Sequence, residues 1–544
     1  MTPGSVLFVN ARVYSPSVPF ASSVLVHNGR IAWVGDDSGA QVHRELAETI
    51  IECGGGFLAP AFVDAHVHAT STGLLLNGLD LSQVANKRDL LDLLSKFSRH
   101  THGAPVIGHG WDQSTWTDMS LPSRAEIDRA SWGSEVYLSR IDVHSALVSS
   151  ALVARAPESR ALQGFGDFAV TATAHERLRT VALNHLNDPA RARAHIAFFD
   201  HALSQGIGSV HEMAGPAISS QADAKMLGER SRTGLGPHVF TYWGQLASDG
   251  GIDVAREIGA MGVGGDLFVD GALGSRTAAL RDEYNDSPGN TGVLYVTPEE
   301  IAAHVGSCIE AGYQSGFHVI GDLGMDTVLS GYQLASQSAD INRLRQGRHR
   351  LEHAELIAES HHAVIKDLHL VASMQPLFDA LWGGEHGMYR QRLGERSSHM
   401  NQWGSLLSQG VSVCFSSDAP VTDVNPWAAI HAAMFHHNPA EQITARAAFS
   451  AHTRAGWRAL GGAFDGHGII DIDAPADLAL WRVDNFAVQV PDQRVTQWST
   501  DPRSATVPLP DLGDATNFQA PQCLLTMVNG RILFRDSTFD GFDT

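Results

Sequence analysis

Two histidines end a short apolar stretch near residue 65, and this feature limits the folds open to the chain more than any other. Residues 62–68 are Phe-Val-Asp-Ala-His-Val-His and follow three glycines and a proline. A short apolar run bounded by such residues predicts a parallel strand buried on both faces. Side chains two apart on a strand point to the same side, so His66 and His68 should project together from its end. Imidazoles are good zinc ligands, although two ordinary polar residues can also end a strand.

The size and charge of the chain define its broad class. At 544 residues it exceeds a typical single domain, and we expect two or three. With 43% apolar and 18% charged residues, the composition is globular rather than disordered. The formal charge of −21 disfavours nucleic acid and anionic membranes as partners, because both attract clustered Lys and Arg.

Cysteine usage and the first residues bear on the cellular compartment. The four cysteines lie far apart and form no Cys-x-x-Cys pair, which favours a reducing compartment over a disulfide framework. The N-terminus has no basic segment followed by an apolar core, and no run of about 18 apolar residues occurs. We therefore expect a cytoplasmic protein without a signal peptide or a membrane span.

Both ends of the chain are rich in β-forming residues. Short apolar runs fill residues 5–60, where Asn28-Gly29 is a hairpin signal, and residues 524–534 repeat the pattern around Asn529-Gly530. We predict that residues 1–60 and 465–544 pair into one composite β-domain. Residues 71–199 contain helical and extended segments of their own and are predicted to form an inserted α/β domain.

The remaining residues, 61–70 and 200–464, alternate helical segments with short apolar strands. Eight such units predict a closed (β/α)₈ barrel of the TIM type. An open doubly wound sheet is the alternative, but no Gly-x-Gly-x-x-Gly between a strand and a helix supports it. The predicted strands are residues 62–68, 208–212, 238–242, 267–271, 316–320, 350–353, 370–374 and 411–418.

Metal-binding residue types stand at the ends of four of these strands, where a barrel enzyme carries its catalytic groups. Any one of them has an ordinary explanation in a chain with 28 histidines. Their coincidence at strand ends, in place of apolar core residues, indicates a metal site. The five candidates are His66, His68, His318, His353 and Asp418.

The sequence resembles the metal-dependent amidohydrolase superfamily, in its amidohydrolase family 3 branch, which includes N-substituted formamide deformylases. The resemblance covers nearly the whole chain. The motifs that carry it are Phe62–His68, Asp270–Ala278, His318–Asp322, Arg350–Ala354, Gln375-Pro376, Ser416–Val421 and Pro475–Leu480.

This resemblance implies the same three-part architecture and assigns roles to the five candidates. The four histidines would hold a divalent metal, most simply zinc, and Asp418 would be both a ligand and the general base. The implied activity is hydrolysis of a non-peptide C–N bond in a small molecule, such as an amide, a formamide or an N-acyl group. The alternatives are deamination of a ring amidine on the same scaffold and a non-catalytic binding or regulatory protein. A homo-oligomer is left open.

Several other residues are weaker candidates. Arg276 could bind a carboxylate or carbonyl of the substrate, or form a structural salt bridge. Trp111 and His144 belong to motifs of the insertion that approach the pocket in this branch, although His144 could equally be a packed core residue. Glu212 could serve the metal or pair with a neighbour. Tyr284 and Asp322 are expected only to support the ligands.

One position departs from the family pattern. Many relatives have a lysine four residues before the Asp-Gly of the fourth strand, and carboxylation of that lysine lets it bridge two metals. This chain has Asp266 there. Because an aspartate is several Å shorter than a carboxylated lysine, we expect Asp266 to pair with a neighbouring polar group. One metal ion per chain is therefore predicted rather than two.

Overall fold

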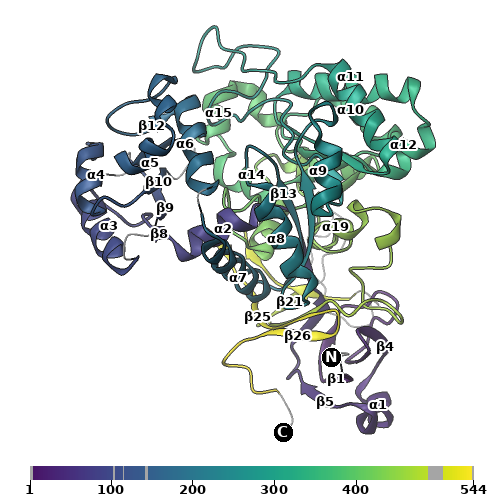
Figure 1. Ribbon diagram of the computed structural model, residues 1–544. Helices are drawn as coiled ribbons and strands as arrows, with labels where there is room; N and C mark the ends of the chain where they lie inside the picture. The colour runs from purple at the N-terminus through teal and green to yellow at the C-terminus, as the bar shows by residue number, and fades with distance from the viewer. Residues whose placement is uncertain are drawn as a thin grey trace.

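The computed structural model describes residues 4–101, 105–113, 116–140, 145–184, 186–487 and 507–541. Its centre is an eight-stranded parallel sheet in which each strand lies beside the next one along the chain (Figure 1). The strands are β7 (Phe62–Val67), β13 (Ile207–Ala214), β14 (His238–Trp243), β15 (Gly262–Val263), β16 (Gln314–Val319), β17 (Arg350–His353), β18 (Val371–Met374) and β19 (Ser412–Phe415).

The last strand of this sheet returns to the first. Beyond β19, the backbone N–H of Asp418 donates to the carbonyl of His66, and that of His68 donates to Ala419, both at 2.9 Å. The buried Asp64 carboxylate also accepts the backbone N–H of Ser417 at 2.9 Å and its hydroxyl at 2.6 Å. These bonds close the cylinder, so the predicted (β/α)₈ barrel is confirmed.

The fourth strand differs from the sequence prediction of residues 267–271. Regular pairing is confined to Gly262–Val263, and residues 267–269 bond to β16 only through His318. Between them, Gly264 and Gly265 have φ angles of 146° and 82°, which favour glycine. A Cβ on Gly264 would stand 2.3 Å from the backbone nitrogen of Gly316. The break therefore depends on glycine, and it reorients the residue that follows, Asp266.

Helices link successive barrel strands and cover the outside of the barrel. Their apolar faces pack on outward-facing strand residues such as Val210, Phe317 and Leu351 in the largest buried core of the protein. The main linking helices are α7 (Asp188–Ser204), α8 (Gln221–Arg232), α9 (Gly251–Ile258), α10 (Pro298–Ala311), α11 (Asp322–Ser338), α13 (Glu359–Asp367) and α16 (Trp403–Ser408), and α17 (Pro426–Met434) follows the last strand.

A separate five-stranded sheet lies to one side of the barrel mouth, between β7 and β13 in sequence (Figure 1). Its own apolar cores include Leu90, Leu138 and Val148. The elements are α2 (Ala69–Asn77), β8 (Leu79–Asp80), α3 (Lys87–Thr101), β9 (Val106–Trp111), α4 (Arg124–Ala130), β10 (Val136–Arg140), β11 (Ser145–Val148), α5 (Ser150–Arg155), β12 (Val170–Thr171) and α6 (Ala172–Asn184).

Strands from the two ends of the chain meet in one sheet below the barrel (Figure 1). Its order is β2 (Arg12–Val13), β6 (Phe57–Pro60), β20 (Leu478–Arg482), β25 (Gln522–Val528) and β26 (Arg531–Arg535). A second sheet has the order β4 (Arg30–Gly35), β3 (Ser23–His27), β1 (Val6–Val9) and β5 (Thr49–Glu52).

The two Asn-Gly hairpin signals are confirmed. Asn28 and Gly29 turn β3 into β4 with φ of 51° and 79°. Asn529 and Gly530 turn β25 into β26 with φ of 48° and 73°. Positive φ at both central residues is the tight turn that matches the twist of paired strands.

The cysteines are buried as free thiols inside this fold. Burial raises the pKa of Cys414 to about 11 and that of Cys308 to about 12. Both thiols are thus held protonated, and neither is poised as a nucleophile. Among the described residues, no helix has the length and apolar character needed to cross a bilayer.

Candidate metal centre

The structure brings the five predicted ligands together at the C-terminal end of the barrel. His66 lies on β7 and His68 directly follows that strand, His318 lies on β16 and His353 on β17, and Asp418 follows β19. The imidazole of His66 lies 5.4 Å from that of His68 and 4.8 Å from that of His353, and the rings of His318 and His353 are 4.6 Å apart. All five side chains are buried. Residues far apart in sequence therefore form one polar cluster.

Unusual backbone angles occur at two of the candidate ligands. Successive residues of a strand normally point to opposite faces, yet Glu352 and His353 both reach His66. His353 has a φ of 68°, which breaks the alternation, and Asp418 has a φ of 54°. Non-glycine residues rarely adopt such angles, and those that do gather at functional sites.

Each histidine has one ring nitrogen held by a protein acceptor. An imidazole whose outer nitrogen donates a proton in this way presents its other nitrogen as a lone pair, which is the arrangement of a metal ligand. The outer contacts are His66 Nδ1 to Glu352 at 3.0 Å, His68 Nδ1 to the Met213 carbonyl at 3.0 Å, His353 Nδ1 to Gln375 at 2.9 Å and His318 Nε2 to the Gly271 carbonyl at 3.3 Å.

The inner atoms of the cluster face one another. His66 Nε2 lies 3.4 Å from Oδ1 of Asp418, and His68 Nε2 lies 3.2 Å from the same oxygen. These three atoms fall within 4.8 Å of one another, a spacing at which one cation could be bound by all of them. His66 Nε2, His318 Nδ1 and Asp418 Oδ1 have no hydrogen-bond partner among the described residues. Buried polar atoms are seldom left in that state, so the donor set fits a metal ion.

Asp266 occupies the middle of this cluster, and the expectation that it pairs elsewhere is wrong. Its carboxylate lies 3.5 Å from His66 Nε2, 3.2 Å from His68 Nε2, 3.5 Å from His318 Nδ1 and 3.7 Å from His353 Nε2. On a regular fourth strand, as predicted, the short side chain of Asp266 would stay close to the backbone. The break at Gly264 and Gly265 carries the short side chain into the centre instead.

The carboxylates control the charge of the centre. Burial alone would lower the pKa of His68, but Asp266 and Asp418 raise it to about 9. Burial would raise the pKa of Asp266, yet His66 and the other histidines hold it well below its usual range. The interior of the barrel mouth therefore favours positive charge, which a divalent cation supplies when it replaces protons on the histidines.

Comparison with known proteins places the chain in a family. The family model described as the amidohydrolase family matches residues 49–534, most of the chain. The chain belongs to this family.

Individual relatives are similar to the chain at low sequence identity. The protein LONG AFTER FAR-RED 3 of Arabidopsis thaliana is 28% identical over 473 residues, which cover 79% of this amidohydrolase and 77% of the plant protein. An N-substituted formamide deformylase of Arthrobacter pascens is 23% identical over 458 residues, 78% and 83% of the two chains. A crystal structure of an uncharacterized metal-dependent hydrolase from Pyrococcus furiosus superposes with a TM-score of 0.72 at 26% identity and covers 88% of this chain and 98% of that one.

A fully buried ion pair supports the ligands from inside the barrel. Glu352 accepts from Arg350 Nε at 2.6 Å and through its other oxygen from the second guanidinium nitrogen at 3.0 Å. The oxygen bonded at 3.0 Å also receives His66 Nδ1. Arg350 further donates to the Ala65 carbonyl at 2.6 Å, one residue before His66, and contacts His211 at 2.9 Å. The pair thus contacts both the ring of His66 and the backbone of β7 beside it.

Sequence reasoning missed the supporting role of Arg350 and Glu352, although both lie in the motif Arg350–Ala354. The available signal was their spacing. Residues two apart on a strand share a face, and two opposite charges on one face of a barrel strand must be paired if that face is the interior.

The weaker candidates are placed less favourably. Arg276 donates to both carboxylate oxygens of Asp286, at 3.1 and 2.9 Å, which is the salt bridge considered from sequence. Trp111 packs in the core of the inserted unit, and its indole N–H donates to the Leu138 carbonyl at 2.8 Å. Packing in this core accounts for the position of Trp111 without a contact to substrate. His144 lies outside the described residues.

The remaining candidates hold backbone groups. Glu212 accepts the N–H of Ala69 at 2.7 Å, Tyr284 donates to the Ala278 carbonyl at 2.8 Å, and Asp322 accepts the N–H of Arg281 at 2.9 Å. Glu212 pairs with a neighbour, as one of the two sequence interpretations had it. Burial raises its pKa to about 7.

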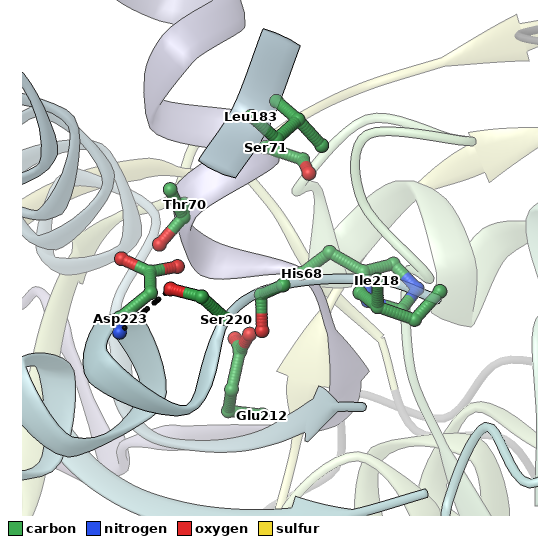
Figure 2. Close-up of a pocket in the computed structure, with 9 residues that line it drawn as sticks. His68, Thr70, Ser71, Leu183, Glu212, Ile218, Ser220 and Asp223 are labelled. Carbon is green, nitrogen blue, oxygen red and sulfur yellow. Dashed lines mark hydrogen bonds between the residues drawn. The ribbon is translucent and has the colours of Figure 1, made fainter. Parts of the chain in front are cut away.

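A small polar cavity lies beside His68, between the barrel mouth and the inserted unit (Figure 2). Its volume of about 10 Å³ is close to what one water molecule needs. Ser220 and Asp223, which begin α8, face it together with Glu212, and Leu183 of α6 contributes an apolar wall. The insertion therefore contacts the surroundings of His68 directly.

Proposed function

We propose that this amidohydrolase is a metal-dependent hydrolase that cleaves a non-peptide C–N bond in an amide, a formamide or an N-acyl group. The observation that carries the proposal is the convergence, at the end of the barrel, of imidazole and carboxylate atoms that have no hydrogen-bond partner among the described residues. The family and the formamide deformylase among the relatives support the choice of a C–N bond. A histidine-rich set with carboxylates favours zinc over magnesium or calcium.

His66, His68 and Asp418 would hold the metal, together with His318 and His353. A divalent metal bound there would lower the pKa of a water to about 7 and polarise a carbonyl group. The carboxylate of Asp418 accepts the proton of the attacking water and passes it to the leaving nitrogen. His66 and His68 are oriented for binding by Glu352 and the Met213 carbonyl.

Substrate selection is proposed to depend on the inserted unit, residues 71–199. The support is the cavity beside His68, which residues of the barrel loops and Leu183 of the insertion line together. Arg276, Trp111 and His144 stay predictions as substrate-binding residues, and the packing of Trp111 argues for an indirect effect.

The test uses purified full-length protein, stripped with a chelator, dialysed and reloaded with zinc or manganese. Turnover is measured on a panel of formamides, N-acyl amines, lactams and ring amidines. His66→Ala and His68→Ala should each lose bound metal and turnover together, whereas His386→Ala, at an exposed histidine, should change neither.

Two outcomes would count against the proposal. Ammonia release from ring amidines, with no amide cleaved, would favour the deaminase alternative. Metal binding without turnover on any member of the panel would favour a binding or regulatory protein.

A further inference from the structure

The two oxygens of Asp266 face different members of the histidine cluster. Oδ2 lies 3.2 Å from Nε2 of His68, on the side of Asp418. Oδ1 lies 3.5 Å from Nδ1 of His318 and 3.7 Å from Nε2 of His353. One carboxylate therefore spans two groups of donors, with His66 Nε2 between them at 3.5 Å from Oδ1.

The donors divide naturally into two sets. His66, His68 and Asp418 present atoms that lie within 4.8 Å of one another, and so do His66, Asp266 and His353. Oδ1 of Asp266 belongs to the second set, and Nδ1 of His318 lies 3.5 Å from it. Both atoms are buried without a hydrogen-bond partner in the described part of the chain. Such atoms require a compensating group.

The backbone is built to place this carboxylate. Gly264 and Gly265 turn the chain immediately before Asp266, and a Cβ at Gly265 would stand 2.5 Å from the sulfur of Met213. Beyond Asp266, the N–H of Val269 returns to the strand ladder by donating to the His318 carbonyl at 2.9 Å. The short side chain of Asp266 therefore reaches the centre from an irregular stretch of backbone.

We infer that Asp266 bridges two divalent metal ions through its own carboxylate. Oδ2 serves the ion held with His66, His68 and Asp418, and Oδ1 serves an ion held with His318 and His353. This inference rests on the metal site of the proposed function and replaces the sequence expectation of one ion. A lysine at this position acquires its bridging carboxylate from carbon dioxide, whereas Asp266 needs no such addition. The pair of ions should therefore assemble without bicarbonate.

The test measures metal content and magnetic coupling and does not depend on any substrate. Chelator-stripped full-length protein is reloaded with zinc, with and without bicarbonate, and dialysed before elemental analysis. A parallel sample is reloaded with manganese and examined by electron paramagnetic resonance. Two equivalents per chain, with or without bicarbonate, and the spectrum of an exchange-coupled manganese pair are expected. One retained equivalent with an uncoupled manganese spectrum would overturn the inference.

Variants locate the bridge. Asp266→Asn keeps the shape but offers one neutral oxygen, so the coupled spectrum should vanish and zinc content should fall from two equivalents to one or fewer. Asp286→Asn, at a surface carboxylate of the Arg276 salt bridge, is the control and should retain both ions. A coupled pair that survives in Asp266→Asn would overturn the assignment of Asp266. The wild-type measurement decides the number of ions even if this variant does not fold. If the wild type holds one ion and His66→Ala holds none, the proposed function would still be supported and only the bridge would be refuted.

Discussion

Replacing Glu352 by Gln should destabilise the barrel and weaken the metal site at the same time. The substitution keeps the shape of the side chain and removes its charge. Arg350 would then hold an unpaired guanidinium at a position with no solvent exposure. Burial works against both charges of this pair, and Arg350, together with His66, keeps the pKa of Glu352 far below its usual range.

The size of the effect follows from these contacts. Removing one partner of a buried ion pair costs about 3–5 kcal/mol, because the other charge stays buried. Native domains are stable by only about 5–15 kcal/mol, so the loss is a large share of the total. The bonds from Arg350 to the Ala65 carbonyl and to His211 survive, which keeps the cost near the lower end of that range. Loss of the carboxylate on His66 Nδ1 should also weaken metal binding about 10–100-fold.

Two measurements separate these effects. Urea denaturation of chelator-treated protein gives the stability change without metal, and competition with a chromogenic chelator gives zinc affinity. The double variant Glu352→Gln, Arg350→Met should be less destabilised than Glu352→Gln alone, since no charge is then left unpaired. Glu310→Gln, at an exposed position of α10, is the control. A loss below about 1 kcal/mol for Glu352→Gln, or strictly additive effects in the double variant, would refute the buried-pair reasoning.

Two further predictions concern the general base and acid stability. Asp418→Asn should lower kcat by about 10²–10⁴-fold while the circular dichroism spectrum is unchanged, because an amide cannot accept the proton at neutral pH; wild-type kcat would contradict the assignment. His349 accepts the N–H of Ser315 through Nδ1 at 2.8 Å, and burial lowers its pKa from 6.5 to about 4. The unfolded chain therefore binds the proton more readily, so stability is complete above pH 6.5 and falls, by up to about 3 kcal/mol for this group, as pH drops toward 4. Urea midpoints measured from pH 7 to 4.5 should fall less steeply in His349→Gln, and equal slopes would contradict the prediction.

The barrel was predictable because its signals are local. Each strand is a short apolar run, and His66, His68, His318, His353 and Asp418 interrupt that pattern where the runs end. Polar residues at equivalent strand ends, where a core residue would be apolar, indicate the position of the site even when no distances are known. The two hairpins were predictable for a similar reason, since Asn-Gly adopts the required positive φ angles.

The internal arrangement of the site was not predictable, because it depends on backbone geometry that the pattern does not encode. Asp266 reaches the cluster only through the conformations of Gly264 and Gly265, and glycines permit many others. His353 faces the interior only because its φ is positive. Trp111 was assigned from a motif, yet the core of the insertion accounts for its position. The three-domain division at residues 60, 70, 199 and 464 stays a prediction of where each unit ends.

The bonds that join the first barrel strand to the last have a consequence for biosynthesis. Asp64 and Ser417 are separated by 353 positions, a stretch that takes a ribosome roughly 20 to 70 s to make at about 5–20 residues per second. For most of that interval β7 is outside the ribosome, whereas β19, which completes its second edge, has not been synthesised. His66 and His68 are therefore present on the nascent chain long before Asp418 is. Such an unpaired apolar edge at residues 62–67 is open to association with other chains until β19 is made.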